Sequence, residues 1–385
     1  MDARKCSREI LEDVIALRRR LHMCPEPGME CRETIDVICA ELDRYSIEYR
    51  RLNDSGVIAD IHGRKDGKTV MLRADMDALK IKEETGLEYA SRNEGLMHAC
   101  GHDMHTAMLL GSARILNEHK DELNGSVRLL FQAGEEVSEG ARFLIENGAL
   151  EGVDMGFGMH VDPLSEAHRL SSRRGASWAA VDHFTVKVKG KGGHGAMPHK
   201  TSDAIVAASS IVMNLQTIVS RMCSPVHPVV VTVGQIHSGS AYNIISEEAF
   251  LEGTCRCFNE EEYGMLPQAF SRICSDIASA LGCIAEVEFS RICRPLVNDE
   301  RAYDIMKKSA EKIMLNEDGY FEAEQAMAGE DFAEYASRIP CVFMNLGTDG
   351  GYPLHSSHLD LKEEAMETGM AMEVQFAADA LAELE

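Results

Sequence analysis

A cysteine and a histidine stand two residues apart in His98-Ala-Cys100-Gly-His102, at a predicted strand-to-helix junction. A thiolate and an imidazole are both good ligands for borderline divalent metals. Gly101 permits a tight turn that would point both side chains at one centre. A buried cysteine beside a histidine that caps a helix would have the same sequence, so this segment alone leaves both interpretations open.

Two adjacent carboxylates, Glu135 and Glu136, follow the apolar run that ends at Phe131. In α/β sheets, functional groups gather at the carboxyl ends of strands. Because adjacent carboxylates repel each other, one is expected to bind a cation while the other stays free as a base. The alternative is a solvated loop with two surface acids.

Two further histidines also follow strand-like runs. His160 ends the segment Gly156-Phe-Gly-Met-His160, and His355 lies beyond the glycine-rich loop 347–351. Each could by itself be a structural histidine. Together, however, the cysteine, three histidines and a glutamate, with a second glutamate to spare, suit two divalent ions that share a bridging ligand. Two-metal hydrolases hold such ions about 3.5–4 Å apart and activate a water between them.

The elements that must position these groups alternate between strand and helix. The pattern predicts strands at 57–61, 69–72, 127–131 and 341–346, and helices at 102–116, 141–146, 302–314, 331–337 and from about 362. An N-terminal amphipathic helix carries the apolar stripe Ile10, Val14, Leu17 and Leu21. Interleaved strands and helices favour an α/β sheet with helices on its faces.

The middle of the chain has an order of its own. Strands are predicted at 184–188, 229–235, 249–258 and 284–289, with helices at 202–220, capped by Thr201 or Ser202, and at 263–281. The order β-α-β-β-α-β matches the ferredoxin-like arrangement. We therefore expect one discontinuous domain, residues 1–180 and 293–385, with an α+β domain inserted at residues 181–292.

Length and charge limit the classes of partner. A chain of 385 residues is longer than single cores usually grow, which favours two domains. Its formal net charge of -24, from 39 basic and 63 acidic side chains, repels phosphate backbones and anionic membranes. No apolar run approaches the roughly 20 residues that span a bilayer. Neither nucleic acid nor a membrane is expected as a partner.

Cysteine usage favours a reducing compartment. The 12 cysteines are scattered, without a C-x-x-C pair, and the N-terminal segment lacks the apolar stretch of a secretory signal. The simplest interpretation is reduced thiols in the cytoplasm, most of them, such as Cys39, acting as small core residues.

Five segments resemble the signature blocks of the amidohydrolase branch of the aminoacylase/carboxypeptidase metallohydrolase family, which includes hippurate hydrolases, auxin-conjugate hydrolases and N-acetyl-diaminopimelate deacetylases. They are MHACGHD, FQAGEE, GFGMH, GKGGHGAMPH and PLHSSH, in the family's order over nearly the whole chain. The resemblance implies an α/β fold, with a mixed-sheet di-metal hydrolase domain and an inserted ferredoxin-like lid through which two chains form a homodimer.

The resemblance also implies roles for particular residues. Two divalent ions (Zn, Mn, Co or Ni) would be bridged by Cys100, with the remaining ligands being His102, Glu136, His160 and His355. Glu135 would be the general base.

This chain departs from the wider family at the end of one predicted strand. Wider relatives place a metal-binding histidine where this chain has Arg73, in Arg73-Ala-Asp75-Met-Asp77. That difference fits the amidohydrolase branch. Asp75 then becomes a candidate for orienting a ligand histidine, with a turn cap as the alternative.

In the inserted domain, His194 matches a family histidine that crosses the dimer interface and hydrogen-bonds the developing oxyanion. Asn243 and Arg256 match positions that contact substrate in relatives. The planar fork of an arginine suits a substrate carboxylate, although a surface arginine is the alternative for Arg256. His199 and the pair Glu330–Asp331 are expected to be structural.

The expected function is metal-dependent hydrolysis of the amide bond of an N-acyl amino acid, which releases a carboxylic acid and a free amino acid. A dipeptidase or carboxypeptidase of the same family is the nearest alternative. A cysteine hydrolase with Cys100 as nucleophile and His102 as base is a second, but residues two apart on a tight turn rarely align that way. A catalytically inactive binding protein is disfavoured because every expected ligand type is present.

Overall fold

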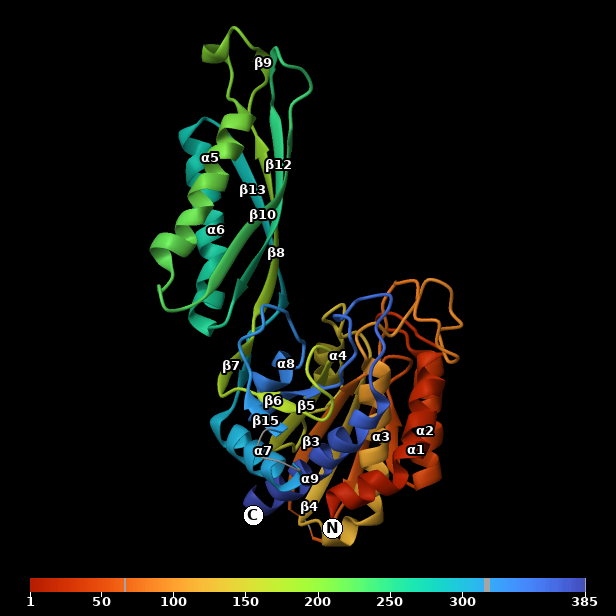
Figure 1. Cartoon of the computed structure of the whole chain (residues 1–385). Coiled ribbons are helices and arrows are strands. Elements are labelled where there is room, and N and C mark those ends of the chain that lie inside the picture. The colour runs from red at the N-terminus through yellow and green to blue at the C-terminus, as the bar shows by residue number, and fades with distance from the viewer. Residues whose placement is uncertain (66, 315–318, 385) are drawn as a thin grey trace. The chain divides into compact units, whose positions relative to one another are not determined.

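The computed structural model describes residues 1–65, 67–314 and 319–384, and the chain divides into two compact units (Figure 1). Unit 1 comprises Met1–Ser177, Val297–Glu324 and Asp331–Glu385, and unit 2 comprises Trp178–Leu296 and Gln325–Glu330. The short return segment in unit 2 pairs with the start of that unit, since the Ala179 N–H donates to the carbonyl of Ala326. It contains no regular helix or strand, so periodicity could not have revealed it.

Unit 1 is built on an eight-stranded mixed sheet in the order β1-β2-β4-β3-β5-β16-β6-β15. The strands are β1 Glu48–Arg51, β2 Gly56–His62, β3 Lys68–Asp75, β4 Gly125–Gln132, β5 Met155–Asp162, β6 Leu170–Ser172, β15 Tyr320–Glu322 and β16 Cys341–Gly347. The neighbours β4, β3, β5 and β16 run parallel, so their carboxyl ends meet at one edge. The four strands predicted for this part of the chain are confirmed, with longer ends.

Helices pack on this sheet (Figure 1). They are α1 Ala3–His22, α2 Arg32–Tyr45, α3 His102–Glu118, α4 Gly140–Glu146, α7 Glu300–Ile313, α8 Ala333–Ala336 and α9 Met366–Leu384. Alternate residues of β3, Val70, Leu72 and Ala74, share one core with the apolar sides of α1, α3 and α9. The predicted stripe on the N-terminal helix lies in this core, as does Cys39. The last α-helix begins at Met366 because residues Glu363–Ala365 form a 3-10 turn first.

One local prediction in unit 1 is wrong. No strand leads directly into the Cys100 segment, because a loop of residues 76–101, containing only isolated bridges, separates β3 from α3. The helix still begins at His102, directly after Gly101, whose φ of 83° is the left-handed conformation that favours glycine. A Cβ atom there would lie 2.5 Å from Val161 Cγ2. The turn therefore requires glycine, as predicted.

Unit 2 contains a four-stranded antiparallel sheet in the order β10-β12-β8-β13. Its elements are β8 Ala180–Lys189, α5 Ala204–Thr217, β10 Val229–Ser238, β12 Glu248–Cys257, α6 Glu260–Ala280 and β13 Ile284–Cys293. Both helices pack against the sheet in a separate core. This β-α-β-β-α-β arrangement is the predicted ferredoxin-like one. Beside it, β9 Gly193–His194 pairs with β11 Ile244–Ile245.

The predicted cap of α5 is wrong. Asp203, rather than Thr201 or Ser202, accepts hydrogen bonds from the Ile205 and Val206 N–H groups. Aspartate caps helices as well as serine does, so three consecutive capping residues could not be ranked from their types.

Contrary to the prediction that no apolar run approaches this length, the segment Ala204–Met222 is long and apolar enough to cross a membrane by length and composition. Its buried residues, which include Ile211 and Leu215, nevertheless belong to the core that α5 shares with α6 and the sheet. A packed core helix passes the same test of length and composition, so the segment is weak evidence for a membrane span.

Candidate metal centre

The parallel strands of unit 1 bring the predicted residues to one edge. Glu135 and Glu136 follow the end of β4, and His160 lies near the carboxyl end of β5. Cys100 and His102 flank the glycine that begins α3, and His355 lies in the loop after β16. Four segments far apart in the sequence therefore converge on one site.

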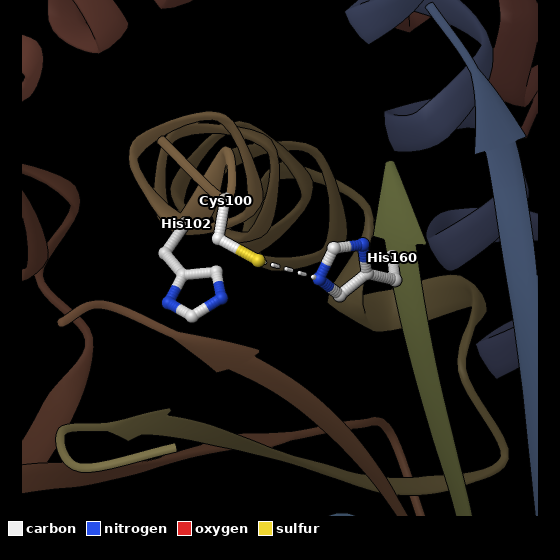
Figure 2. A group of neighbouring side chains, drawn as sticks. All are labelled: Cys100, His102 and His160. Atoms are coloured by element: carbon white, nitrogen blue, oxygen red, sulfur yellow. Dashed lines mark hydrogen bonds between the residues drawn. The ribbon is translucent and has the colours of Figure 1, made fainter. Parts of the chain in front are cut away.

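Two groups of ligand atoms share the cysteine. Ligand atoms of Cys100, His102 and His160 lie within 4.8 Å of one another, and so do those of Cys100, Glu136 and His355. Figure 2 shows the first group, with the Cys100 sulfur pointing at the ring of His160, 3.4 Å from its Nε2, and His102 beside it. The structure thus brings all five predicted ligands together.

Backbone carbonyls orient two of the histidines. His102 Nδ1 lies 2.9 Å from the carbonyl oxygen of Asp77, and His160 Nδ1 lies 2.8 Å from that of Val161. A carbonyl can only accept, so each Nδ1 carries the hydrogen and donates it. Each Nε2 is then left to present a lone pair to a cation.

His355 is held by its backbone. Its N–H donates to the carbonyl of Ala99 at 2.7 Å, which ties the loop after β16 to the residue before Cys100. Its Nε2 lies 3.3 Å from Glu136 Oε1, and its side chain is exposed, unlike those of the other two histidines. This side of the site is therefore open to water.

The protonation of the site depends on burial and neighbouring charge. Burial raises the pKa of the Cys100 thiol well above its ordinary value. Burial would also raise the pKa of Glu136, but the hydrogen bond from His355 and the charge of His102 lower it below its ordinary value. The Glu136 carboxylate is thus ionised at neutral pH, whereas the Cys100 thiol is protonated.

The donor atoms fit divalent ions. His102 Nε2 is buried and, in the described part of the chain, has no hydrogen-bond partner. Buried polar atoms without a partner are uncommon and point to a missing ligand. One cysteine, three histidines and a carboxylate form a donor set for borderline metals such as Zn, Mn, Co or Ni. The residues therefore fit two such ions.

Glu135 lies beside this donor set. Its carboxylate is within 4.8 Å of ligand atoms of His102 and Glu136, and its Oε1 is 3.4 Å from the Asp331 N–H. The side chain is half-buried. A carboxylate next to a metal group, and not needed as a ligand, can act as a base.

Asp75 is placed differently from the prediction. Its closest histidine is His105, whose Nδ1 lies 2.6 Å from Oδ1, whereas His102 Nε2 is 3.8 Å away from Oδ2. The Nε2 of His105 accepts the Val161 N–H at 2.9 Å. Asp75 and His105 therefore support the backbone that follows His160, one of the predicted ligands. The spacing of His102 and His105, three apart on one helix face, was the signal that could have revealed His105.

Arg73 is a buried cation beneath the site. It donates to Asp75 at 2.6 Å, to Asp331 at 2.7 Å and to Gln132 at 3.0 Å. Burial opposes ionisation of Asp75, but His102, Arg73 and His105 outweigh it and hold the pKa of Asp75 well below its ordinary value. Asp331 also accepts the Ala141 N–H, which agrees with its expected structural role.

In unit 2, two of the three predicted residues lie together. His194 Nδ1 accepts the Ala196 N–H at 3.0 Å, so the ring hydrogen sits on Nε2 of this exposed side chain. The Asn243 carbonyl accepts the Gly195 N–H at 2.8 Å, which joins the two loops. Arg256 lies near the opposite end of β12, on the order of 20 Å along the strand at its usual rise. Within unit 2, therefore, Arg256 is not brought near the other two, and the exposed His199 lies beyond them in the loop.

The chain belongs to peptidase family M20/M25/M40, whose family model matches residues 71–379. It is 41% identical over 356 residues to the N-acetyl-L-cysteine deacetylase of Bacillus subtilis (strain 168), covering 92% of this chain and 85% of that protein. It is 41% identical to the N-acyl-L-amino acid amidohydrolase of Geobacillus stearothermophilus, covering 75% of this chain and 79% of that protein.

A solved structure shares the fold. The YXEP protein of Bacillus subtilis, described as a dinuclear metal-binding peptidase of family M20, matches with a TM-score of 0.87 and 34% identity. The match covers 97% of this chain and 99% of that one. The predicted family and the α/β di-metal hydrolase fold class are thereby confirmed.

Proposed function

We propose that this chain is a metal-dependent amidohydrolase that cleaves the amide bond of N-acyl amino acids. The convergence of Cys100, His102, Glu136, His160 and His355 beside Glu135 is the observation that carries the proposal. The deacetylase and amidohydrolase relatives are named for reactions on N-acyl amino acids, which supports this substrate class over the dipeptidase or carboxypeptidase alternative.

The five ligands would hold two divalent ions, with Cys100 as the shared ligand because its sulfur belongs to both groups of ligand atoms. When bound, the ions would acidify a water molecule and polarise the substrate carbonyl. The protein itself orients His102 and His160 through the carbonyls of Asp77 and Val161, and holds the His355 loop through Ala99.

Glu135 would move the protons. It accepts a proton from the attacking water as the carbon–oxygen bond forms at the amide carbonyl. It then delivers that proton to the leaving nitrogen as the carbon–nitrogen bond breaks. The products are a carboxylate and the free amino acid. A positioned base of this kind contributes about 10²–10⁴-fold to a rate.

The test is a hydrolysis screen of N-acetyl, N-benzoyl and long-chain N-acyl amino acids, with dipeptides alongside, after loading Zn, Mn, Co or Ni. A chelator should abolish activity and added ion should restore it, whereas the activity of a cysteine hydrolase would be unchanged by either.

Glu135→Gln should lower kcat about 10²–10⁴-fold. Glu139→Gln, an exposed acid in the same turn, is the matched control and should be unaffected. Unchanged hydrolysis in Glu135→Gln would remove the base assignment.

For unit 2 we propose that His194, with its hydrogen on Nε2, stabilises the oxyanion that forms on the substrate. Such a donor is worth about 3 kcal/mol in the transition state. Asn243, joined to the same loop, and Arg256 are proposed as substrate contacts. His194→Ala should lower kcat far more than it changes KM, and an equal change in both would contradict the assignment.

We also propose a homodimer through unit 2. On α5, the side chains of Val206 and Met213 are 49% and 71% exposed, and Ile236 on the outer strand β10 is 51% exposed. Exposed apolar side chains on a helix and on a sheet edge are groups that an interface would cover, and they support this proposal. Met213→Glu should convert a dimer to a monomer in light scattering, and an unchanged mass would argue against this surface.

A cytoplasmic location is proposed as well. All twelve cysteines are free thiols, and nine of them are buried. Oxidising compartments favour disulfides, so this thiol set fits a reducing one. Fractionation of cells that make the native protein would test the location.

A further inference from the structure

A cavity of about 680 Å³ lies in unit 1, and none of the residues that converge on the candidate metal centre is among the described residues that line it. Two arginines of α1, Arg4 and Arg8, line this cavity together with Arg169, which lies between β5 and β6. Glu367, near the start of α9, lines it as well. Small-molecule sites have volumes of about 300–1,000 Å³, and guanidinium groups pair with carboxylates, so this wall favours an anionic ligand.

The arginines of the cavity outnumber the acid that neutralises them. Glu367 Oε1 accepts hydrogen bonds from Arg4 at 3.3 Å and from Arg8 at 3.0 and 3.2 Å. Arg4 also donates to the carbonyl of Ile313 at 2.7 Å, a contact that adds no negative charge. The Glu367 side chain is 12% exposed, whereas Glu166, the other acid on the wall, is open to water. Three arginines beside one sheltered carboxylate leave a local excess of positive charge in a chain whose net charge is -24.

Arg169 lacks a carboxylate partner among the described residues. Its Nε is buried, and no described residue accepts a hydrogen bond from it. Its guanidinium carbon lies 4.5 Å from the centroid of the Phe321 ring, so an aromatic face supports the cation without neutralising it. Because nearly all buried donors have an acceptor, this guanidinium requires one from outside the chain.

The backbone that carries Arg169 is held in an uncommon conformation. His168 has a φ of 69°, in the left-handed region that few residues other than glycine adopt. Its N–H donates to the Gly347 carbonyl at 3.1 Å, and the Gly347 N–H donates to the Arg169 carbonyl at 2.7 Å. The Nδ1 of His168 lies 2.8 Å from Thr368 Oγ1. Residues in such conformations persist only where their surroundings fix them, and they cluster at ligand-binding sites.

This wall of the cavity is also joined to the loop after β16. Residues 348–350 donate three successive backbone hydrogen bonds, of 2.8 to 3.0 Å, to carbonyls within residues 162–165. Residues 166–169 of the cavity wall follow that stretch directly. A ligand that pairs with Arg169 therefore contacts a segment that is hydrogen-bonded to residues 347–350.

We infer that this cavity is a second ligand site, which binds a small organic dianion with two carboxylate groups. Arg4 and Arg8 come from α1, and Arg169 comes from the segment after β5, so one carboxylate can pair with the helix and the other with Arg169. The planar fork of each guanidinium matches the two oxygens of a carboxylate. The site shares no residue with the candidate metal centre, so the inference does not depend on the proposed function.

Calorimetric titration of the full chain with malonate, succinate and glutarate tests the inference. The titration is done without added metal ions, so that a carboxylate does not bind at the metal centre instead. At least one of the three dicarboxylates should bind, and more weakly as salt is added, because salt screens charge pairs. Butyrate, with one carboxylate, should bind about tenfold more weakly or less well still. Absence of binding by all three dicarboxylates overturns the site, and inorganic phosphate that binds as tightly overturns the choice of a ligand with two carboxylates.

Arg169→Met removes the unpaired guanidinium but keeps an apolar side chain beside the Phe321 ring. This variant should weaken dicarboxylate binding about 10–100-fold, the usual effect of losing a hydrogen bond to a charged group. Arg19→Met is the matched control, because Arg19 is an arginine of α1 that is 48% exposed and does not line the cavity. It should bind the dicarboxylate as the unmodified protein does. Unchanged binding in a folded Arg169→Met variant overturns the inference.

A second variant covers the case in which Arg169→Met does not fold. The Arg8 side chain is 64% exposed, so Arg8→Met should fold, and it should weaken binding about 2–5-fold. Unchanged binding in that variant also overturns the inference. Hydrogen exchange locates the ligand, since a bound dicarboxylate should slow exchange in residues 162–169 and 347–350. Protection confined to the segments of the metal ligands would place the dicarboxylate there and contradict the site.

Discussion

Buried carboxylates behave in opposite ways in two regions of the molecule. Next to His102, a proposed metal ligand, Asp103 accepts hydrogen bonds from Arg18 Nε at 2.7 Å and from His22 Nδ1 at 2.8 Å. Burial opposes its ionisation, but Arg18 and His22 hold the pKa of Asp103 well below its ordinary value. Asp75 is kept ionised in the same way by His102, Arg73 and His105.

Two buried carboxyl groups that lie away from those ion pairs show the opposite shift, because their pKa values are raised. Glu373, buried on α9, accepts a hydrogen bond from Ser112 at 2.6 Å, and burial raises its pKa to about 8. In unit 2, Asp182 on β8 is fully buried, and neither of its oxygens accepts a hydrogen bond from the described residues. Arg291 Nε lies 3.8 Å away, and burial raises the pKa of Asp182 to about 6.

Buried carboxylates that stay ionised lie next to the candidate metal centre. Buried ion pairs seldom raise stability above what apolar residues would provide, because desolvation offsets their attraction. In this protein such pairs involve Asp103, beside the proposed ligand His102, and Asp75, which supports the backbone after His160 through His105. Their arrangement therefore fits a task of orientation, whereas an isolated buried carboxyl simply takes up a proton.

The largest effect should come from breaking an ion pair. Arg18→Met would leave Asp103 buried without its cation and should destabilise the protein by about 3–5 kcal/mol in urea unfolding at pH 7. The control is Arg19→Met, since Arg19 is 48% exposed and pairs with Glu363 at the surface. That change should cost about 1 kcal/mol or less. Equal losses of stability in the two variants would contradict the difference between the buried and the surface ion pair.

Glu373→Gln should stabilise the folded protein, whereas Arg18→Met should destabilise it. The raised pKa means that the folded state retains a proton the unfolded chain has lost, so stability falls as pH rises from about 4.5 to about 8. Glutamine removes this dependence. The variant should match the parent at pH 4.5 and exceed it by a few kcal/mol at pH 9, because each unit of pKa shift corresponds to about 1.4 kcal/mol. Glu383→Gln, an exposed acid on the same helix, should show no such difference.

Asp182→Asn should also stabilise the folded protein, over a lower and narrower range of pH. With a folded pKa of about 6, its proton is lost between about pH 4 and pH 6, and stability falls over that range. The variant should gain about 1–3 kcal/mol over the parent at pH 7, and nothing near pH 4. The exposed Asp276→Asn is the control in the same unit. A flat profile in the parent would show that Arg291 pairs with Asp182 more closely than the distance indicates.

The smallest effect concerns the hydrogen bond to Glu373. Ser112→Ala removes a donor that lowers the pKa of Glu373, so that pKa should move further above 8. The expected loss is about 1 kcal/mol at pH 9 and less at pH 5. Unfolding of the Ser112→Ala and Glu373→Gln double variant would check it, since the pH-dependent part should vanish there.

Much of the candidate site was predictable because metal binding depends on a few residue types. Cysteine, histidine and glutamate at the ends of apolar runs pointed to a metal centre before any coordinates, and five of them converge. Asp77 and Arg18 were not predictable. An aspartate in a loop and an arginine on a polar helix face have the same sequence pattern whether they face solvent or are buried.

The sequence by itself determined which atoms could bind metal and which elements would carry them, because ligand chemistry and hydrophobic periodicity are local. Only the tertiary structure decided that Asp77 receives the Glu135 and Glu136 amides, that Asp75 contacts His105 rather than His102, and that Asn243 and Arg256 lie at separate ends of unit 2. The physical reason is that hydrogen bonds between distant segments depend on packing, and packing is set by the whole core at once.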